Sequence, residues 1–212
     1  MSRIFLPQKL NADTTIEITK EAHHYISRVL RMKKGDPLYL FNGGDEEFDA
    51  KILDVQKNKT VISIGIKIKT NKESPIEIVI GQGIPKGQKM DEMIPKITEL
   101  GATALTPLIT ERSDLKKISP QKIERWKKIA TSSTEQTGRT KILMICPPST
   151  LSELLQRYPE HEKILFYELE DSLTLEQALR NSSSQKFCLI IGPEGGFSKR
   201  EIEEAQKKGC KI

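Results

Sequence analysis

The sequence predicts an α/β fold in two parts, a small β-rich part followed by a mostly parallel sheet. Three observations lead to this prediction. Up to about residue 70, short segments of alternating apolar residues are joined by tight turns, which is typical of a small barrel. Residues 70–75 are polar and end in a proline, as expected of a domain boundary. After them strands alternate with helical segments, which favours a parallel sheet. We therefore predict two domains, residues 1–72 and residues 73–212.

The first domain is expected to contain one helix and several strands. Residues 20–31 have helical periodicity, and Gly35 follows their end. The turn from Asn42 to Asp45 contains two glycines and predicts a hairpin. The strands are expected at residues 15–18, 38–41, 48–55 and 62–68, where the last has the clearest alternation.

The second domain is expected to alternate between strands and helices along its whole length. Pro95 falls inside the first helical segment and is expected to kink or divide it. The expected strands are residues 76–80, 104–109, 142–145, 164–167 and 187–191. The expected helices are residues 88–100, 120–136, 151–158, 175–181 and 198–208.

Composition excludes several classes of protein. Hydrophobic residues make up 36% of the chain and charged residues 30%, which is typical of a soluble globular protein. No apolar run approaches the ~20 residues of a membrane span, and the N-terminus has no signal-peptide pattern. The three scattered cysteines and three histidines argue against a disulfide framework or a zinc site. We therefore expect a cytoplasmic protein without a bound metal.

The net charge of +5 is unevenly distributed along the chain. Residues 1–72 carry 13 basic and 9 acidic residues, and residues 73–150 carry 12 and 9. Residues 151–212 carry 9 basic and 11 acidic residues, so the excess of positive charge lies in the first two-thirds. This distribution is consistent with a polyanionic partner such as RNA, or with ordinary solvated lysines. Arg28 and Arg31, in the predicted first helix, are candidates for RNA contacts.

The most informative segment is the glycine-rich turn near the C-terminal end. A continuous apolar run ends at Ile191, and Gly192, Gly195 and Gly196 follow at once. Ser198 and Glu201 form a capping-box pattern, so a helix is expected to begin there. Ligands of open α/β sheets bind at the carboxyl ends of strands. We therefore expect a cofactor at this turn.

A second glycine-containing segment, residues 81–87, also follows a predicted strand. It partly matches the dinucleotide fingerprint, but its third glycine is one residue late and Pro85 lacks an amide donor. A plain connecting loop is the better interpretation. Lys86, Lys89 and Lys96 lie along this loop and the next helix, and either face RNA phosphates or form a solvated helix face.

Glu135 and Arg139 lie at the end of the long predicted helix, where Gly138 is expected to supply the C-cap. They form either a polar pocket wall or a helix-end ion pair.

Several motifs in a fixed order together resemble a known family. They are His24…Val29-Leu30-Arg31…Gly35-Asp36, Lys86-Gly87…Lys96…Glu99-Leu100-Gly101, Pro107…Glu111-Arg112-Ser113, Glu135-Gln136-Thr137-Gly138-Arg139 and Ile191-Gly192-Pro193-Glu194-Gly195-Gly196. In this order they closely resemble the ribosomal RNA small subunit methyltransferase E family, of the SPOUT class of knotted methyltransferases. The resemblance covers essentially the whole chain, and the glycine-rich turn is its most specific element.

The resemblance implies a PUA-like RNA-binding barrel followed by a trefoil-knotted domain that holds S-adenosylmethionine. It implies a homodimer that methylates N3 of a specific uridine in the 16S ribosomal RNA of the small ribosomal subunit. Glu135 is then the candidate general base and Arg139 the candidate electrostatic stabiliser. The candidate cofactor-binding residues are Ile191, Gly192, Glu194, Gly195 and Gly196. The candidate RNA-binding residues are Arg28, Arg31, Lys86, Lys89, Lys96 and Arg112.

The chain departs from the family pattern at Pro95 and at its end. The family pattern continues after Ile212 with a further strand and an arginine-containing segment that closes the knot. If that segment is truly missing, residues 1–212 alone are expected to bind the cofactor weakly or not at all and to carry out no methylation. The alternative functions are a non-catalytic RNA-binding or ribosome-assembly module and, more distantly, a nicotinamide-dependent oxidoreductase.

Overall fold

The computed structural model describes residues 1–69, 72–115, 117–170, 173–180 and 182–212. Its contacts divide the chain into two compact units. Unit 1 comprises Met1–Glu73 and Thr134–Ile142, and unit 2 comprises Ser74–Ser133 and Leu143–Ile212. The long helix α3 (Pro120–Thr137) therefore contributes its last turn to unit 1. No helix in the described part of the chain is long and apolar enough to cross a membrane.

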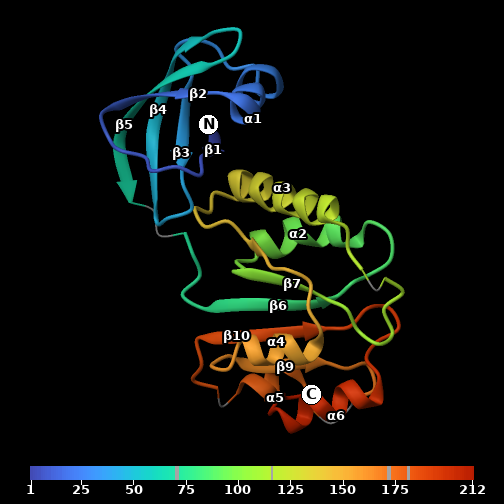
Figure 1. Ribbon diagram of the computed structural model, residues 1–212. Helices are drawn as coiled ribbons and strands as arrows, with labels where there is room; N and C mark the ends of the chain where they lie inside the picture. Colours follow the sequence, from blue (N-terminus) through green and yellow to red (C-terminus); the bar gives the residue numbers. More distant parts are fainter. Residues whose placement is uncertain (70–71, 116, 171–172, 181) are drawn as a thin grey trace. The chain divides into compact units, whose positions relative to one another are not determined.

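Unit 1 is built around a five-stranded sheet (Figure 1). Its strands are β1 (Ser2–Phe5), β2 (Thr14–Ile18), β3 (Pro37–Phe41), β4 (Glu46–Val55) and β5 (Thr60–Lys69). They follow the order β1-β3-β4-β5-β2, in which only the β1–β3 pair is parallel. Inward-facing apolar residues of all five strands form one core. The predicted strands are confirmed. Strand β1 was not predicted, because a strand of four residues is too short to show a clear alternation of apolar and polar residues.

The structure of unit 1 differs from the sequence prediction in two respects. The single helix predicted over residues 20–31 is one α-helical turn, α1 (Lys20–His24), followed by a π-helical turn, η1 (Tyr25–Val29). Arg31 then takes a left-handed backbone conformation with φ of 52°, which ends the helix before Gly35. The hydrogen-bonded order leaves β1 and β2 as the two edges of the described sheet, so barrel closure is not shown.

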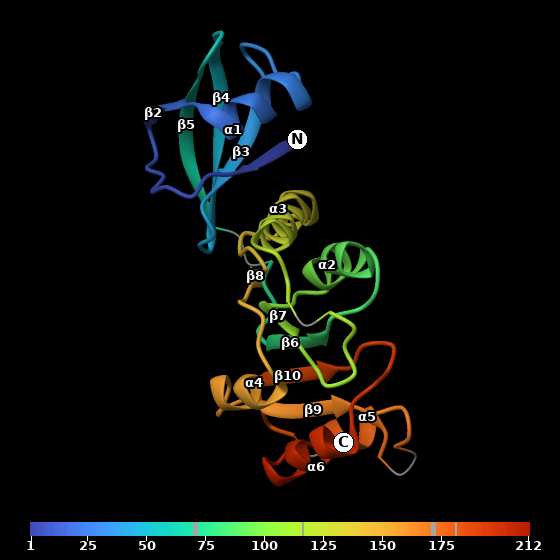
Figure 2. The ribbon, with the colours of Figure 1, turned by 45° about the vertical axis from the view of Figure 1, so that its right-hand side comes forward.

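Unit 2 contains a five-stranded, fully parallel sheet in the order β8-β7-β6-β10-β9 (Figures 1 and 2). The strands are β6 (Glu77–Gly83), β7 (Ala104–Leu108), β8 (Met144–Ile145), β9 (Glu162–Phe166) and β10 (Lys186–Ile191). The helices are α2 (Lys89–Glu99), α3 (Pro120–Thr137), α4 (Leu151–Arg157), α5 (Leu175–Leu179) and α6 (Lys199–Lys207). This alternation confirms the predicted α/β pattern; residue 181, the expected end of α5, lies outside the described residues.

The chain order explains where a ligand can bind in unit 2. The chain crosses from β8, at one edge of the sheet, to β9 at the other edge, and β10 then inserts between β9 and β6. The strands are parallel, so the carboxyl ends of β6, β9 and β10 lie together at the same end of the sheet. This is also where the strand order reverses. α4 and α6 pack together, and Leu154 and Ala205 contribute to the same core as Ile190.

Helix α2 runs through Pro95 without division, contrary to one of the predicted outcomes. Proline removes one backbone hydrogen bond from a helix interior and strains the preceding turn. Met90, Ile94 and Ile97 of α2 are buried, and this packing outweighs the local cost. Gly101 ends α2 and Gly138 ends α3, both with positive φ, as predicted.

Candidate functional site

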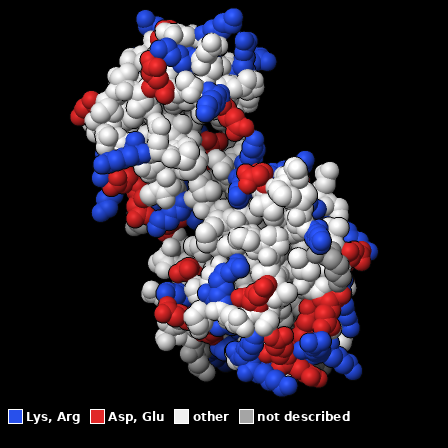
Figure 3. Space-filling view, viewed as in Figure 1, with Lys and Arg blue, Asp and Glu red and all other residues white. Residues whose placement is uncertain are grey.

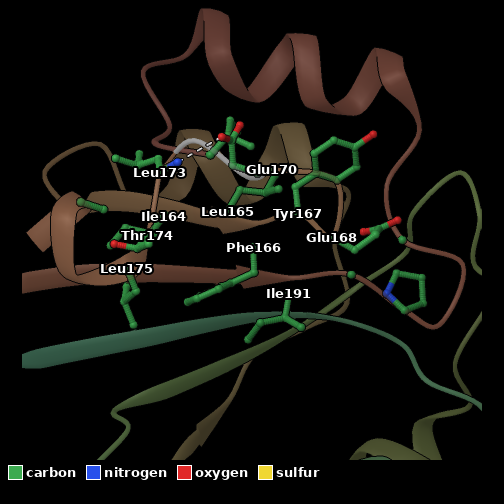
Figure 4. Close-up of a pocket in the computed structure, with 15 residues that line it drawn as sticks. Ile164, Leu165, Phe166, Tyr167, Glu168, Glu170, Leu173, Thr174, Leu175 and Ile191 are labelled. Carbon is green, nitrogen blue, oxygen red and sulfur yellow. Dashed lines mark hydrogen bonds between the residues drawn. The ribbon is translucent and has the colours of Figure 1, made fainter.

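A cavity of about 420 Å³ lies at the carboxyl ends of β9 and β10 in unit 2 (Figure 4). Its volume falls within the range of small-molecule binding sites. The lining residues come from β9, the segment that follows it, α5, the start of the glycine-rich turn, and Ile212. They are Ile164, Leu165, Phe166, Tyr167, Glu168, Glu170, Leu173, Thr174, Leu175, Ala178, Ile191, Gly192, Pro193, Gly196 and Ile212.

The cavity combines apolar walls with two carboxylates. Phe166 and Ile191 are partners in the β9–β10 ladder and lie side by side in Figure 4. Leu173 lies at the opposite side of the cavity, and its N–H donates to Glu170 Oε1 at 3.2 Å. Glu168 is the second carboxylate, next to the glycine-rich turn. Such a cavity suits a ligand with an apolar ring and one or more positive groups.

The glycine-rich turn can adopt its shape only because two positions lack a side chain. Gly196 has φ of +65° and donates its N–H to the Pro193 carbonyl at 2.8 Å. A Cβ at Gly196 would overlap the Glu168 carboxylate. A Cβ at Gly83, at the end of β6, would overlap the Pro193 ring and backbone nitrogen. Close approach of the backbone therefore requires glycine at both positions.

Gln82 holds the start of this turn from the neighbouring strand. It is 7% exposed, and its Nε2 donates to the Gly192 carbonyl at 3.1 Å and to the Gly83 carbonyl at 2.8 Å. The sequence analysis assigned Gly81–Gly87 to a loop, so it missed this contact. The structure places Gly81, Gln82 and Gly83 inside β6, which is incompatible with a dinucleotide-binding loop at that position.

The turn is followed by helix α6, whose N-terminus matches the predicted capping box. Ser198 Oγ accepts a hydrogen bond from the Glu201 N–H at 3.1 Å, and the Glu201 side chain accepts one from the Ser198 N–H at 2.9 Å. Glu201 also accepts from the Glu111 N–H at 3.0 Å, so the helix start is tied to the segment after β7. These bonds satisfy backbone donors that the helix cannot satisfy internally.

Glu194 and Gly195 belong to the turn but are not among the residues that line the cavity. Glu194 forms an ion pair with Lys89 at 2.6 Å and accepts from the Lys86 N–H at 3.3 Å. The hydrogen bond from Lys89 lowers the pKa of Glu194 to about 2. Arg112 Nη1 donates to the Gly195 carbonyl at 3.0 Å. In this structure these residues fasten the outer side of the turn to α2 and to the segment after β7.

The other candidate RNA-binding residues are exposed. Lys86 forms an ion pair with Asp114 at 2.9 Å, and the hydrogen bond to Asp114 raises the pKa of Lys86. Lys96 is exposed on α2, and Arg28 and Arg31 are exposed in unit 1. On the face shown in Figure 3, basic side chains are interspersed with acidic ones and form no single continuous patch.

Glu135 and Arg139 both belong to unit 1, and neither lines the cavity. Glu135 accepts a hydrogen bond from the Phe5 N–H of β1 at 3.0 Å. Burial raises the pKa of Glu135, although the bonds from Phe5 and Tyr25 and the charge of Arg3 oppose the rise. Arg139 is 5% exposed and donates through Nε and Nη2 to Glu73 at 3.0 and 2.7 Å.

The wall formed by β9 and the segment after it was missed by the sequence analysis. One signal could have indicated it. Phe166 and Tyr167 end a predicted strand and Glu168 comes directly after it, as the glycine-rich turn does after β10. Neighbouring parallel strands end at the same edge, so both segments were expected there once the strand order was known. That order depends on tertiary contacts and cannot be read from periodicity.

Among the described residues, no cluster of three or more histidine, cysteine, aspartate or glutamate side chains is arranged to hold a metal ion.

Comparison with known families identifies both parts of the chain. Residues 72–212 match the family described as RNA methyltransferase domain, and residues 18–64 match the RNA methyltransferase PUA domain. Ribosomal RNA small subunit methyltransferase E from Buchnera aphidicola (Schizaphis graminum) is 34% identical over 98% of this chain and 85% of its own length. The Bacillus subtilis protein of the same name is 32% identical over 96% and 84%. The Synechocystis protein of that name is 33% identical over 93% of this chain, which spans 65% of its length.

Solved structures agree with these matches. A methyltransferase from Legionella pneumophila in complex with S-adenosylmethionine has a TM-score of 0.87 and 33% identity, over 98% of this chain and 86% of that one. A ribosomal RNA small subunit methyltransferase E from Neisseria gonorrhoeae bound to S-adenosylmethionine has a TM-score of 0.92 and 27% identity, over 100% and 87%.

The fold and the site thus define a two-part RNA methyltransferase class, with a PUA domain and a parallel α/β domain. Within that class, the chain belongs to the ribosomal RNA small subunit methyltransferase E family.

Proposed function

We propose that this protein transfers the methyl group of S-adenosylmethionine to N3 of a specific uridine in the 16S ribosomal RNA of the small subunit. The observation that carries the proposal is the cavity at the ends of β9 and β10, bounded by the family's glycine-rich turn. Two related proteins of known structure have S-adenosylmethionine bound.

The chemistry of the cavity fits this cofactor. S-adenosylmethionine has an apolar adenine ring, a ribose diol, and positive sulfonium and ammonium groups. The walls near Phe166 and Ile191 can receive the ring, and the carboxylates of Glu168 and Glu170 can interact with the diol or the positive groups. When bound, the cofactor supplies an activated methyl group with its own leaving group. Gly192 and Gly196 then leave room for it against the backbone of the turn.

The acceptor base needs help because uridine N3 carries a proton. A general base must remove that proton, or a positive group must stabilise the charge that develops on the flanking carbonyl oxygens. We keep Glu135 as the proposed base, since its raised pKa makes it a stronger base than an ordinary glutamate. Arg139 is the proposed electrostatic stabiliser. Both roles require the target uracil to be unpaired from the rest of the RNA when it is methylated.

The remaining proposals concern domains and partners. Residues 1–72 are proposed to form a PUA-like RNA-binding barrel, and residues 73–212 a trefoil-knotted SPOUT domain. The protein is proposed to act as a homodimer without a metal. The RNA is proposed to contact Arg28, Arg31, Lys86, Lys89, Lys96 and Arg112, while Glu194 and Gly195 complete the cofactor turn.

The decisive experiment combines cofactor binding with product analysis. Calorimetric titration is expected to show binding of S-adenosylmethionine to the purified protein. Incubation with small ribosomal subunits that lack the modification should then yield 3-methyluridine in 16S rRNA, detected by mass spectrometry of its nucleosides. Binding of the subunit without methyl transfer would reject the enzyme in favour of the non-catalytic module.

Replacing Gln82 with leucine should weaken S-adenosylmethionine binding by about tenfold. The leucine cannot donate to the part-buried Gly192 carbonyl or to the buried Gly83 carbonyl, and loss of the donor to a buried acceptor costs ~1–3 kcal/mol. Calorimetric titration would measure the change. The Gln56→Leu variant is the control, since the side chain of that glutamine donates to Asp54 at an exposed position in unit 1. Equal dissociation constants for Gln82→Leu and the unmodified protein would contradict the proposed role.

A further inference from the structure

A second cavity lies in unit 1, on the face of the sheet that points away from the core. Its volume is about 470 Å³. It is lined by Met1, Gly35, Pro37, Leu38, Tyr39, Asp49, Ala50, Lys51, Ser63 and Gly65. None of these residues is among the candidate site residues above.

Strand register brings the polar residues of this cavity together. Tyr39 of β3 is directly opposite Asp49 of β4, and Lys51 of β4 is opposite both Pro37 and Ser63. Opposite residues in an antiparallel pair share one face of the sheet, as do residues two apart on a strand. Tyr39, Asp49, Lys51 and Ser63 therefore form one row beside the cavity.

The Asp49 carboxylate is the unusual group in this row. Its Oδ1 is buried and has no hydrogen-bond partner among the described residues. It lies directly over Gly65, where a Cβ would overlap it. A glycine within a strand often marks such a close approach. A buried acceptor without a hydrogen-bond partner destabilises the folded protein and is therefore a candidate for ligand binding.

The chemistry of the row indicates what kind of ligand would fit. An ionised carboxylate only accepts hydrogen bonds, and its χ2 torsion is soft enough to turn both oxygens toward a ligand. Guanine is the RNA base with two adjacent N–H donors, N1–H and the N2 amino group, on its Watson–Crick edge. Tyr39 offers an aromatic face on which an unpaired base can stack, and Lys51 offers a positive charge for the adjoining phosphate.

We propose that the cavity beside Tyr39, Asp49 and Lys51 binds an unpaired guanine of the RNA substrate. The carboxylate of Asp49 accepts hydrogen bonds from guanine N1–H and N2–H, and Gly65 keeps the space that the carboxylate needs. The inference rests on the proposed function only in taking RNA as the ligand. The proposed contact recognises a guanine of the RNA, which is a different nucleotide from the methylated uridine.

The test compares short single-stranded RNAs in fluorescence anisotropy titrations with the full chain. Each is an oligouridine with one central guanosine, inosine or adenosine. Inosine keeps the N1–H of guanosine but lacks the N2 amino group. We expect the guanosine RNA to bind about tenfold more tightly than the inosine and adenosine RNAs, as a bidentate pair implies. Equal affinities for the three RNAs would overturn the inference without any protein variant.

Protein variants then test whether Asp49 is responsible for the preference for the guanosine RNA. Asp49→Asn is expected to abolish the preference for guanosine, because an amide cannot accept from both donors. Asp54→Asn is the matched control, since it removes the same charge from an exposed position on β4. A preference that survives Asp49→Asn would place guanine elsewhere. Methylation of small subunits by a protein without base preference would overturn this inference alone and leave the proposed function intact.

Discussion

Replacing Gly83 with alanine is expected to raise the dissociation constant for S-adenosylmethionine by about ten- to a hundredfold. The new Cβ would overlap the Pro193 ring and backbone nitrogen and lie 2.8 Å from the Gly192 carbonyl carbon. Two of the clashing atoms are backbone and the third belongs to the proline ring that is bonded to the backbone nitrogen, so none of them can move by a change of rotamer. β6 and β10 are hydrogen-bonded neighbours, with Gln82 paired to Ile191, so the turn itself must move. A displacement of this kind costs ~1–3 kcal/mol and removes the cavity wall formed by Gly192.

The measurement is calorimetric titration of the variant, with thermal unfolding to confirm that it folds. Gly87→Ala is the control from the same region. Gly87 has φ of +66°, so alanine there is strained, but nothing lies within 4 Å of its added Cβ. The control should lose some stability and keep its cofactor affinity. If Gly83→Ala bound the cofactor as tightly as Gly87→Ala, the turn would not be the cofactor site.

Replacing Arg139 with alanine is expected to lower the free energy of unfolding by ~3–5 kcal/mol. Arg139 and Glu73 form an ion pair at 2.7 Å with side chains only 6% and 16% exposed. Glu73 also accepts from the backbone N–H groups of Thr140 and Lys141 at 3.0 and 3.1 Å. Removal of Arg139 leaves the carboxylate without its ion-pair partner, while lysine at that position cannot reproduce the contact through two nitrogens.

Urea unfolding followed by circular dichroism would measure this loss. Lys141→Ala is the matched control, because the ion pair of Lys141 with Asp45 at 2.8 Å is exposed and should contribute at most ~1 kcal/mol. A loss for Arg139→Ala no larger than that of the control would show that the buried pair is unimportant. Because Arg139 is also the proposed electrostatic stabiliser, the unfolding curve must be measured before any loss of activity is interpreted.

The same pair predicts a dependence of stability on pH. Burial of Glu73 acts to raise its pKa, but hydrogen bonds from Arg139, Lys141 and Thr140 and the charge of Arg139 outweigh burial and lower it. A lowered pKa in the folded state means that the stabilisation is complete above the unfolded value of about 4.3 and is lost as pH falls through the folded value. Unfolding curves between pH 7 and 3 should show this loss, and Glu73→Gln should reduce it.

The sequence alone determined most secondary structure and the family. Alternating apolar residues predicted β2 to β5, because a strand buried on one face has apolar residues at every second position. The continuous apolar run that ends at Ile191 predicted β10, because a strand buried on both faces has apolar residues throughout. Gly101 and Gly138 ended their helices as expected, since a helix C-terminus favours a residue with positive φ. The capping box at Ser198 was also visible, because its two partners are only three residues apart.

Only the tertiary structure decided which residues share a site. The insertion of β10 between β6 and β9 brings the glycine-rich turn beside Glu168 and Gln82, residues far from it in the chain. The same folding gives Arg139 the distant partner Glu73 in place of a neighbour on its own helix. Hydrophobic periodicity and capping motifs depend only on residues within one helix or strand. The choice of neighbouring strand depends on long-range packing, which leaves no fixed spacing in the sequence.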